Sequence, residues 1–378
     1  MVTLQPDTPL APALRERIGG AIDAFIDAQL PMLAPMGQNV EPLVHLAREF
    51  CAGGKRLRPA FCLWGAVAAG AQVDEVEVTT PLVRLAASLD LLHVSALMHD
   101  DVMDGSDTRR GRPAAHVQYT AAHRERDWLG DAEGFGVAGS ILLGDLLLVW
   151  STQLADESGL ERAALDAALP LLHAMRAEVA CGQFLDVTAQ VQPFGDPANM
   201  VSDTERVVEY KSARYSVQRP VMVGAAAGAS LAGRDADSTT KLLEALGTFG
   251  SLVGRAFQYR DDVLGIFGDT DVTGKPAGDD LREGKRTVLI AETLRRVDDA
   301  TATRFQGLLA RELSVEEVET ARSIIREAGA LDRVEDHIST AVADATSALE
   351  AAHTAGLVTD AGRQGLLGLM HAAVDREH

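Results

Sequence analysis

The sequence predicts an all-α fold, and three observations support this class. Apolar and small residues recur every three or four positions between Leu82 and Asp100, as they do on one face of a helix. Ser314-Val-Glu-Glu317 has the pattern of a capping box, and Gly329 is placed to end that helix. Aromatic residues make up only 4% of the chain, and no long stretch alternates apolar with polar residues, which disfavours a β-rich core.

The chain is expected to form a single domain over residues 1–378, although its length alone would suit two or three domains. It has no Pro/Ser-rich linker and no internal repeat. A core that bears the motifs would span about residues 50–290, and surface helices rich in Ala, Glu and Arg would form residues 291–378. Short loops are expected where Gly, Pro and Asp gather, near residues 105–115, 124–139, 191–204 and 268–286.

The chain is strongly acidic. Its 378 residues include 35 basic and 55 acidic side chains, which give a formal net charge of −20. A chain of this charge is a poor candidate for general binding to nucleic acid or to anionic lipid. If it binds a ligand rich in phosphate, it needs local clusters of basic residues, metal ions or both.

The cysteines and the apolar segments bear on location. Three cysteines without a CxxC pair form neither a disulfide framework nor a zinc site, which indicates a reducing compartment. The N-terminus lacks the pattern of a secretory signal. The segment of residues 220–233 is too short, and too rich in small residues, to span a bilayer. A second apolar segment, residues 141–150, is interrupted by Asp145. The sequence therefore predicts a soluble, cytoplasmic protein without a transmembrane segment.

The first chemical signal is the run His99-Asp100-Asp101-Val102-Met103-Asp104. On a helix, Asp100 and Asp104 share a face, where two carboxylates repel unless a cation lies between them. Oxygen ligands of this kind suit Mg²⁺ together with phosphate oxygens of a substrate. The pattern alone is more typical of a solvated acidic helix end. Three arginines follow, however, and guanidinium groups beside metal-binding carboxylates predict a metal–diphosphate site; these are Arg109, Arg110 and Arg112.

Two further segments combine charges in a similar way. Asp261 and Asp262 precede a basic loop that contains glycines, at residues 273–286. In the segment GGKRLRP, residues 53–59, three basic side chains follow two glycines and suit a phosphate grip, although an ordinary helix start would look the same. Two acid–base blocks about 160 residues apart predict two walls of one cavity bridged by metal ions.

Two weaker signals lie between these segments. Glu178, Gly182 and Asp186 are spaced to share one helical face. Lys211 and Tyr215, in KSARYS, are one helical turn apart. Taken alone, each set is more often a surface feature than a site.

Seven sequence blocks together resemble the trans-isoprenyl diphosphate synthases of the polyprenyl synthetase family, most of all the geranylgeranyl diphosphate synthases. In chain order they are GGKRLRP, LLHVSALMHDDVMDGSDTRRGRP, GDLLL, EVACGQFLD, KSARYS, FQYRDD and TGKPAGDDLREGKRT. The resemblance implies a single helical bundle around a deep central cavity, assembled as a homodimer. It also implies Mg²⁺-dependent, head-to-tail condensation of isopentenyl diphosphate with dimethylallyl, geranyl or farnesyl diphosphate, with release of pyrophosphate.

The resemblance also assigns roles to individual residues. About three Mg²⁺ ions would be bound by Asp100, Asp104 and Asp261. Asp101 and Asp262 would support these direct ligands or contact the ions through water. The residues implied to bind the allylic diphosphate are Arg109, Lys211, Gln258 and Lys275. Those implied to bind isopentenyl diphosphate, away from the metal ions, are Lys55, Arg58, His93 and Arg110. The expected catalytic set is Asp100, Asp104, Arg109, Lys211, Asp261 and Lys275.

One position departs from the family pattern. Many members carry a third aspartate in the second motif, DDxxD, whereas here the run that begins with Asp261 ends in Gly265. Activity is expected to survive, because the resemblance places the main metal contact on Asp261. Whether Asp269, eight residues after Asp261, compensates for the missing carboxylate is left open by the sequence.

The length of the product is argued from the helix that carries the first motif. Ser95 and Ala96 lie about one turn before Asp100, on the side where the growing tail should extend. In the resembling farnesyl synthases, a bulky aromatic residue there closes the cavity early. Two small residues predict a product of C20, geranylgeranyl diphosphate, or longer, unless Leu89 and Leu92, further down, set the floor.

Two other functions fit part of the pattern. A terpene cyclase shares the all-α fold and an aspartate-rich motif, but it has no use for a grip on isopentenyl diphosphate such as GGKRLRP with Arg109 and Arg110. A regulatory subunit of a heteromeric synthase would be expected to have lost aspartates of the first motif or basic residues of the grip. All of these residues are present here.

Overall fold

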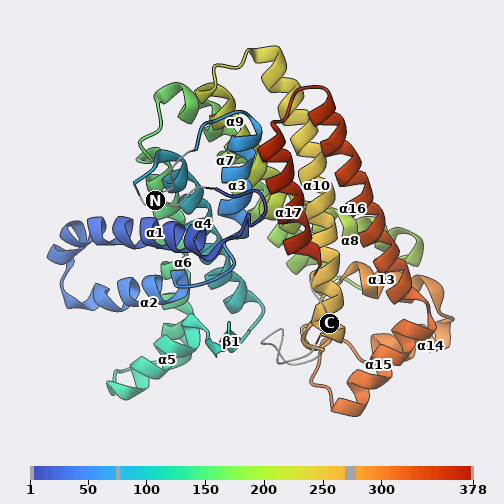
Figure 1. Cartoon of the computed structure of the whole chain (residues 1–378). Helices are drawn as coiled ribbons and strands as arrows, with labels where there is room; N and C mark the ends of the chain where they lie inside the picture. The colour runs from blue at the N-terminus through green and yellow to red at the C-terminus, as the bar shows by residue number, and fades with distance from the viewer. Residues whose placement is uncertain (1–3, 74–76, 78, 269–277, 376–378) are drawn as a thin grey trace. The chain divides into compact units, whose positions relative to one another are not determined.

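The computed structural model describes residues 4–73, 77, 79–268 and 278–375 (Figure 1). In this part of the chain the only strands are β1 (Thr108–Arg109) and β2 (Arg112–Pro113), which form a two-residue antiparallel ribbon; helices dominate the rest. The predicted all-α class is confirmed. The chain divides into two compact units, so the prediction of a single domain stays a prediction. The first unit comprises Met1–Leu169, Pro220–Thr239 and Thr359–Leu369, and the second comprises Pro170–Arg219, Thr240–Val358 and Met370–His378.

The first unit is built around α4 (Pro81–Met103), the helix predicted from the periodicity of its apolar residues. Helix α4 packs against several neighbours, and Trp64 and Trp150 are among the largest fully buried side chains of this unit. The other elements of the unit are α1 (Pro12–Leu33), η1 (Ala34–Met36), η2 (Gln38–Val40), α2 (Glu41–Cys51), α3 (Leu57–Ala68), α5 (Ala115–Glu125), α6 (Ala132–Asp156) and most of α9 (Arg219–Leu231).

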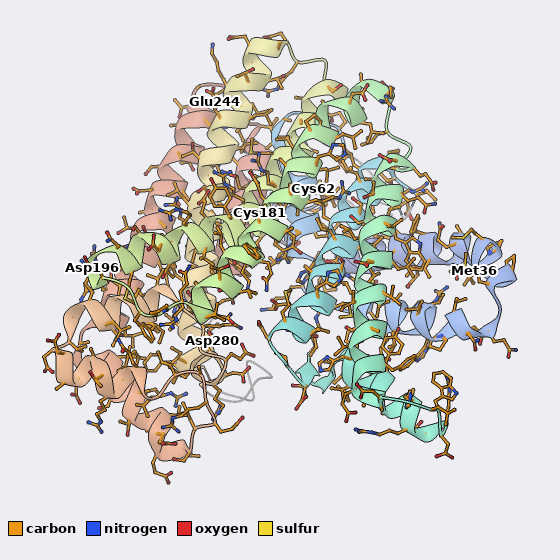
Figure 2. The ribbon with its side chains drawn as sticks, turned by 180° about the vertical axis from the view of Figure 1, so that it is seen from behind. Met36, Cys62, Cys181, Asp196, Glu244 and Asp280 are labelled. Carbon is orange, nitrogen blue, oxygen red and sulfur yellow. The ribbon has the colours of Figure 1, made fainter. Side chains whose placement is uncertain are left out.

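Small residues allow α9 to approach α3 within the first unit. A Cβ atom added at Gly224 would lie 2.6 Å from the carbonyl carbon of Cys62, a residue labelled in Figure 2. One added at Gly228 would lie 2.7 Å from the Cα atom of Ala66. Real Cβ atoms do not approach so closely, so glycine is required where the two backbones meet. Helix packing therefore explains the glycines at positions 224 and 228.

Glycines also bring α5 and α6 together, and they correct an expected loop. Residues 132–139 were expected in a loop but begin α6, where the side chain of Asp131 caps the helix by accepting from the backbone N–H of Glu133. A Cβ atom at Gly139 would lie 2.7 Å from the Tyr119 ring of α5. Glycine here allows two helices to pack closely and does not form a turn. The sequence alone does not distinguish these two roles of glycine.

The other segments expected to be loops are only partly so in the structure. Residues 105–115 contain the β-ribbon and the start of α5, whereas residues 197–204 are helical and belong to α8 (Pro197–Val207). Proline suits the first position of a helix because that position needs no backbone donor, so Pro197 begins a helix instead of preventing one. Of residues 268–286, the described part contains α12 (Asp279–Arg282).

The second unit contains the π-helix η3 (Val208–Gln218), which carries the KSARYS segment. Helix α13 (Val288–Arg296) packs against α8 and α16 (Ala330–Thr354), and α15 (Val315–Glu327) also packs against α16. The predicted capping box of Ser314 and Glu317 is present at the start of α15, and Gly329 follows that helix with φ +64°, as predicted. The remaining helices are α13 (Val288–Arg296), α14 (Asp299–Gln306), α15 (Val315–Glu327) and α16 (Ala330–Thr354); α7 (Arg162–Val191), α10 (Ala236–Phe267) and α17 (Asp360–Val374) contribute residues to both units.

Two helices of the described residues are long and apolar enough to cross a membrane by length and composition alone. In α4, 72% of the apolar window is buried, as expected for the central helix of a packed unit. In α6 only 33% of the window is buried, which leaves an apolar side of that helix exposed. Residues 220–233, the segment weighed from the sequence, are not among them.

Candidate active site

The three aspartates of the first motif lie at the C-terminal end of α4. Asp104 caps the helix, and its backbone N–H donates to the carbonyl oxygen of Asp100 at 2.8 Å, so these residues lie one turn apart. The C-terminal end of a helix carries partial negative charge, which makes clustered carboxylates unfavourable there unless cations are near. A cation bound at this helix end would therefore be electrostatically favourable.

Arg109 supplies one positive charge to this helix end. Its Nε donates to Asp101 Oδ1 at 2.7 Å, its Nη2 donates to the same oxygen, and Nη2 lies 3.7 Å from Asp100 Oδ2. Asp101 is fully buried, and burial raises the pKa of its carboxyl, an effect that Arg109 partly offsets. Asp101 is thus buried and hydrogen-bonded to Arg109, while Asp100 and Asp104 remain partly exposed.

The GGKRLRP segment turns sharply into α3. Gly53 and Gly54 have φ values of +74° and +87°, and Arg56 is left-handed at φ +56°. The buried guanidinium of Arg56 donates to the carboxylate of Asp90 and, at 2.5 Å, to the carbonyl oxygen of Cys51. Arg56 therefore anchors the loop, which leaves Lys55, the exposed neighbour in the run of basic residues, in contact with solvent.

Several basic residues of the predicted isopentenyl diphosphate grip gather in the first unit. The Arg110 guanidinium lies beside Gly54, 3.3 Å from where its Cβ would be, and donates to the carbonyl oxygen of Phe50 at 3.4 Å. Burial, then Arg58, Arg110 and two further arginines lower the pKa of His93 well below 6.5. His93 is therefore neutral near pH 7, and it would act on a diphosphate as a hydrogen-bond donor rather than as a cation.

The second aspartate motif lies near the C-terminal end of α10, in the second unit. Gln258, the residue expected to contact the allylic diphosphate, donates from Nε2 to Asp262 Oδ1 at 2.8 Å. Asp262 is only 5% exposed, whereas Asp261 is partly exposed. Burial, followed by the negative charge of Asp280, raises the pKa of Asp262 well above its ordinary value.

Lys211 lies on η3 and donates to the carboxylate of Asp186 on α7. The two elements approach closely, because a Cβ atom at Gly182 would lie 2.7 Å from the Cα atom of Lys211. The spacing of Glu178, Gly182 and Asp186 was a weak signal in the sequence, and the structure shows that this face of α7 packs against the segment that carries Lys211. Lys275 and Asp269 lie outside the described residues.

An ionic network extends from Glu178 along η3. Glu178 accepts from Arg214 at 2.8 Å and from Arg219 Nε at 2.8 Å. Arg214 also donates to Glu209 at 2.9 Å, across five residues of the π-helix, and Glu209 accepts from Arg255 of α10. The spacing in the sequence does not reveal these partners, because the π-helix alters which side chains share a face.

Among the residues that the structure describes, no three His, Cys, Asp or Glu side chains form a group that could hold a metal ion. The carboxylates of the two motifs belong to different units, and each set is described by itself. Oδ2 of Asp101 and Oδ2 of Asp262 are buried without a hydrogen-bond partner in the described part of the chain. Such orphaned oxygens, with nearby carboxylates, suit a hard cation that completes its ligand shell with water or phosphate oxygens.

The two residues expected to set product length lie on α4. Ser95 is buried, and Ala96, one turn before Asp100, is partly exposed. Leu89 and Leu92, further along the helix, are buried. The helix therefore presents only a methyl group at position 96, beside the first motif.

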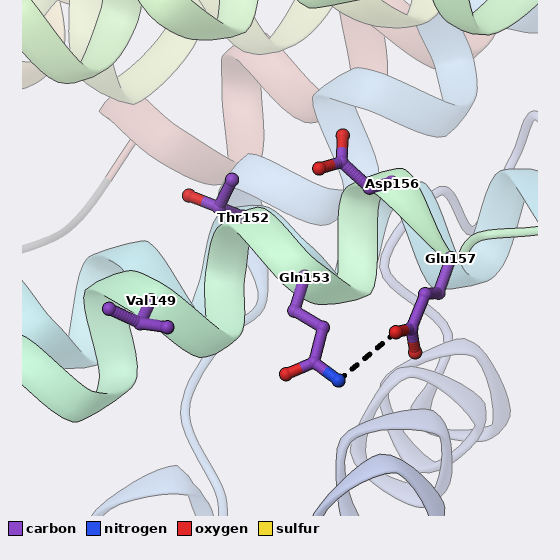
Figure 3. A pocket seen from close by; sticks show the side chains of 5 residues that line it. All are labelled: Val149, Thr152, Gln153, Asp156 and Glu157. Atoms are coloured by element: carbon purple, nitrogen blue, oxygen red, sulfur yellow. Dashed lines mark hydrogen bonds between the residues drawn. The ribbon is translucent and has the colours of Figure 1, made fainter.

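A hollow of about 380 Å³ lies at the C-terminal end of α6 (Figure 3). It is lined by Val149, Thr152, Gln153, Asp156 and Glu157, and Gln153 donates to Glu157 at 3.1 Å. All five residues belong to one helix or directly follow it. None of them is a predicted site residue.

Comparisons with known proteins agree with the order of the motifs. The sequence profile of a family described as polyprenyl synthetase matches residues 40–328. The chain is 33% identical over 335 residues to a geranylgeranyl diphosphate synthase of Mycobacterium tuberculosis, covering 85% of this chain and 83% of the relative. It is also 30% identical over 372 residues to a nonaprenyl diphosphate synthase of the same organism, covering 98% and 95%.

A solved structure is similar along almost the whole chain. It is the geranylgeranyl pyrophosphate synthase of Corynebacterium glutamicum, complexed with isoprenyl diphosphate and magnesium. The TM-score is 0.86 and the identity 34%, with 99% of this chain and 100% of that chain covered.

The depressed pKa of His93 predicts how stability depends on pH. Below about pH 6.5 the unfolded chain binds a proton at this histidine, which the folded protein resists, so this contribution to stability is present above about pH 6.5 and is lost as the pH falls. We expect the free energy of unfolding, measured in urea, to decline less steeply between about pH 7 and pH 5 in His93→Gln than in the wild type. Exposed His45→Gln is the control, and equal slopes for His93→Gln and the wild type would contradict the prediction.

Proposed function

The chain belongs to the polyprenyl synthetase family and is a prenyltransferase, and from this premise we propose that it joins isopentenyl diphosphate head to tail to an allylic diphosphate. The products would be pyrophosphate and a trans-polyprenyl diphosphate. The observation that carries the proposal is the arrangement in the first unit, where Arg109 pairs with the aspartates that end α4. Four arginines, Arg58, Arg110, Arg109 and Arg56, are also close enough to His93 to lower its pKa.

This arrangement suits two diphosphates with different fates. The allylic diphosphate must leave as pyrophosphate, so it belongs beside Asp100 and Asp104, where Arg109 and bound Mg²⁺ ions would supply positive charge. Isopentenyl diphosphate supplies the double bond and keeps its diphosphate, so it belongs with Lys55, Arg58, His93 and Arg110. Arg56 supports the second site indirectly, because its buried pairing with Asp90 anchors the loop that carries Lys55 and leads into α3, where Arg58 lies in the first turn.

The carboxylates are proposed to hold about three Mg²⁺ ions, which stabilise negative charge on the departing pyrophosphate when bound. Asp100, Asp104 and Asp261 would bind the ions directly, in keeping with their partial exposure. Asp101 and Asp262 are held by Arg109 and Gln258, which suits a role behind the direct ligands. Arg109, Lys211, Gln258 and Lys275 are proposed to bind the allylic diphosphate. The proton released at the end of each addition would pass to pyrophosphate.

The experiment that tests this function is a product assay. Purified protein would be incubated with labelled isopentenyl diphosphate, Mg²⁺ and dimethylallyl, geranyl or farnesyl diphosphate in turn, and the dephosphorylated products sized by chromatography. We expect a ladder of prenyl products from the wild type. Asp100→Ala should lower kcat by several orders of magnitude, because it removes a metal ligand needed in the transition state, while its circular dichroism and melting stay close to the wild type.

The same assay separates the alternatives. A cyclic hydrocarbon without incorporation of isopentenyl diphosphate would indicate a terpene cyclase. No incorporation by folded protein with any primer would indicate a regulatory subunit that needs a partner. Near-normal turnover by folded Asp100→Ala would contradict the assignment of the metal ligands.

We further propose that the product is C20 or longer, because Ser95 and Ala96 are small and Ala96 is partly exposed beside the first motif. Ala96→Phe is expected to shorten the product, since the ring would fill the path of the growing tail. The measurement is the product distribution by chromatography, with Ala96→Ser as the matched control. An unchanged distribution in Ala96→Phe would show that other residues, such as Leu89 and Leu92, set the floor.

We also propose that the chain forms a homodimer through α6. Its exposed apolar side chains repeat at intervals of seven, as Phe135, Leu142 and Val149 in one row and Ile141 and Leu148 in the adjacent row. Leu142 is 58% and Val149 62% exposed. Two adjacent rows with a seven-residue repeat form the stripe along which one helix packs against another, and a two-fold axis would bring the same stripe from a second copy.

Charges placed in this stripe should separate the subunits. We expect the double variant Leu142→Glu, Val149→Glu to elute as a monomer, because four buried carboxylates at the helix pair, two from each copy, would outweigh the apolar contact. Size-exclusion chromatography with light scattering gives the mass. The control is Leu129→Glu, a 97% exposed position just before α6. A wild-type monomer, or a double variant that stays dimeric, would contradict this interface.

A further inference from the structure

The segment that carries Lys211 is wound as a π-helix over its whole length. Element η3 runs from Val208 to Gln218, whereas α8 before it and α9 after it are α-helices. π-Helices are rare, appear mostly as single turns and are frequent at functional sites. A run of 11 residues therefore needs interactions that stabilise the wider turn, and the side chains of η3 provide them.

Glu209 and Arg214 form an ion pair that favours the wider turn. Arg214 Nε donates to Glu209 Oε1 at 2.9 Å, across five residues. An α-helix advances about 100° per residue, so a separation of five residues would place the two side chains about 140° apart on its surface. The hydrogen bonds of a π-helix link residues five apart, which brings these two side chains to one side. The ion pair therefore stabilises the π-helical form relative to the α-helical form.

Neighbouring helices hold both members of this ion pair. Glu209 Oε2 accepts from Ser251 at 3.0 Å and from Arg255 at 2.9 Å, both on α10. Arg214 Nη1 donates at 2.8 Å to Glu178 on α7. Burial of Glu209 raises the pKa of its carboxyl, but hydrogen bonds from the two arginines outweigh burial and hold this pKa below its ordinary value. The pair therefore stays charged at neutral pH.

Three residues on one face of α7 contact η3 at successive points. Glu178 accepts from Arg214. Gly182 lies against the backbone of Lys211, where an added Cβ atom would be 2.7 Å from Cα. Asp186 accepts from the ammonium group of Lys211. A change in the winding of η3 would turn Arg214 relative to Lys211, so these three contacts would not form together.

We propose that Glu209 and Arg214 are positioning residues, which hold η3 in its π-helical form and thereby direct the ammonium group of Lys211 toward the allylic diphosphate. This inference rests on the proposed function, because it concerns a residue proposed to bind that substrate. Glu209 and Arg214 act through the backbone of η3, since Lys211 lies between them in the chain.

The test measures the binding of each substrate without turnover. Isothermal titration in the presence of Mg²⁺ gives the affinity for an unreactive S-thiolo analogue of geranyl diphosphate and, separately, for isopentenyl diphosphate. Glu209→Gln keeps the shape of the side chain and removes its charge. We expect it to weaken binding of the analogue by about tenfold and binding of isopentenyl diphosphate by less than about twofold. The matched control is Asp203→Asn, an exposed carboxylate of α8 paired with Arg206, which should bind both ligands like the wild type.

A double-mutant cycle with Lys211 separates positioning from a general loss of structure. If Glu209 acts through Lys211, Glu209→Gln should weaken binding of the analogue by less than about twofold once Lys211→Ala is present. A tenfold loss that persists in the Lys211→Ala background would overturn the inference. Equal weakening of both ligands by Glu209→Gln, or wild-type affinity in that variant, would overturn it as well.

A milder variant keeps the test decisive if Glu209→Gln does not fold. The side chain of Arg255 is 41% exposed, and Arg255→Gln removes one hydrogen bond from Glu209 while the ion pair with Arg214 remains. We expect a selective loss of affinity for the analogue of about threefold, which is again absent in the Lys211→Ala background. Wild-type affinity in Arg255→Gln, or a loss shared by both ligands, would count against the inference.

Failure of the proposed function would give different results. Wild-type protein that binds neither diphosphate would contradict the proposed prenyl transfer. Wild-type affinity for the analogue in Lys211→Ala would contradict the assignment of Lys211 to the allylic site.

Discussion

The central constraint in this protein is that carboxylates brought close together need a positive charge between them. A chain with a net charge of −20 places aspartates at the C-terminal end of α4, where the helix itself adds negative charge. Arg109 holds Asp101 there, and in the second unit Gln258 holds Asp262 while Asp186 holds Lys211. Each of these pairs gives a hydrogen bond to a buried carboxylate, while the neighbouring Asp100, Asp104 and Asp261 are partly exposed.

Close backbone packing makes these pairs geometrically possible. Gly182 lets α7 reach the π-helix that carries Lys211, and Gly265 leaves room on α10 for the carboxylate of Asp280. In the first unit, Gly224 lets α9 lie against α3, the helix that begins at the GGKRLRP loop. At these three positions glycine acts through the absence of a side chain.

Much of the fold was predictable because it depends on local spacing. The helical face from Leu82 to Asp100, the capping box at Ser314 and the stop at Gly329 are patterns of neighbouring residues, and the structure confirms them. The expected loop at residues 132–139 was wrong, because the glycines in that segment answer to Tyr119 and Thr120 on another helix. A segment rich in glycine can be an exposed loop or a helix whose glycines pack against an aromatic ring, and the composition does not distinguish the two.

For the candidate site, the sequence by itself determined which residue types are present and which share a helix face, such as Asp100 and Asp104. It also determined the family, since seven blocks in order depend only on residue identity. Only the tertiary structure decided which side chains interact and which are buried. Arg56 is buried and pairs with Asp90, whereas Lys55 beside it is exposed. The carboxylate of Asp280 lies against Gly265. The physical reason is that burial and ion pairing depend on residues far apart in the chain, whereas helical spacing depends on residues within a few positions of one another.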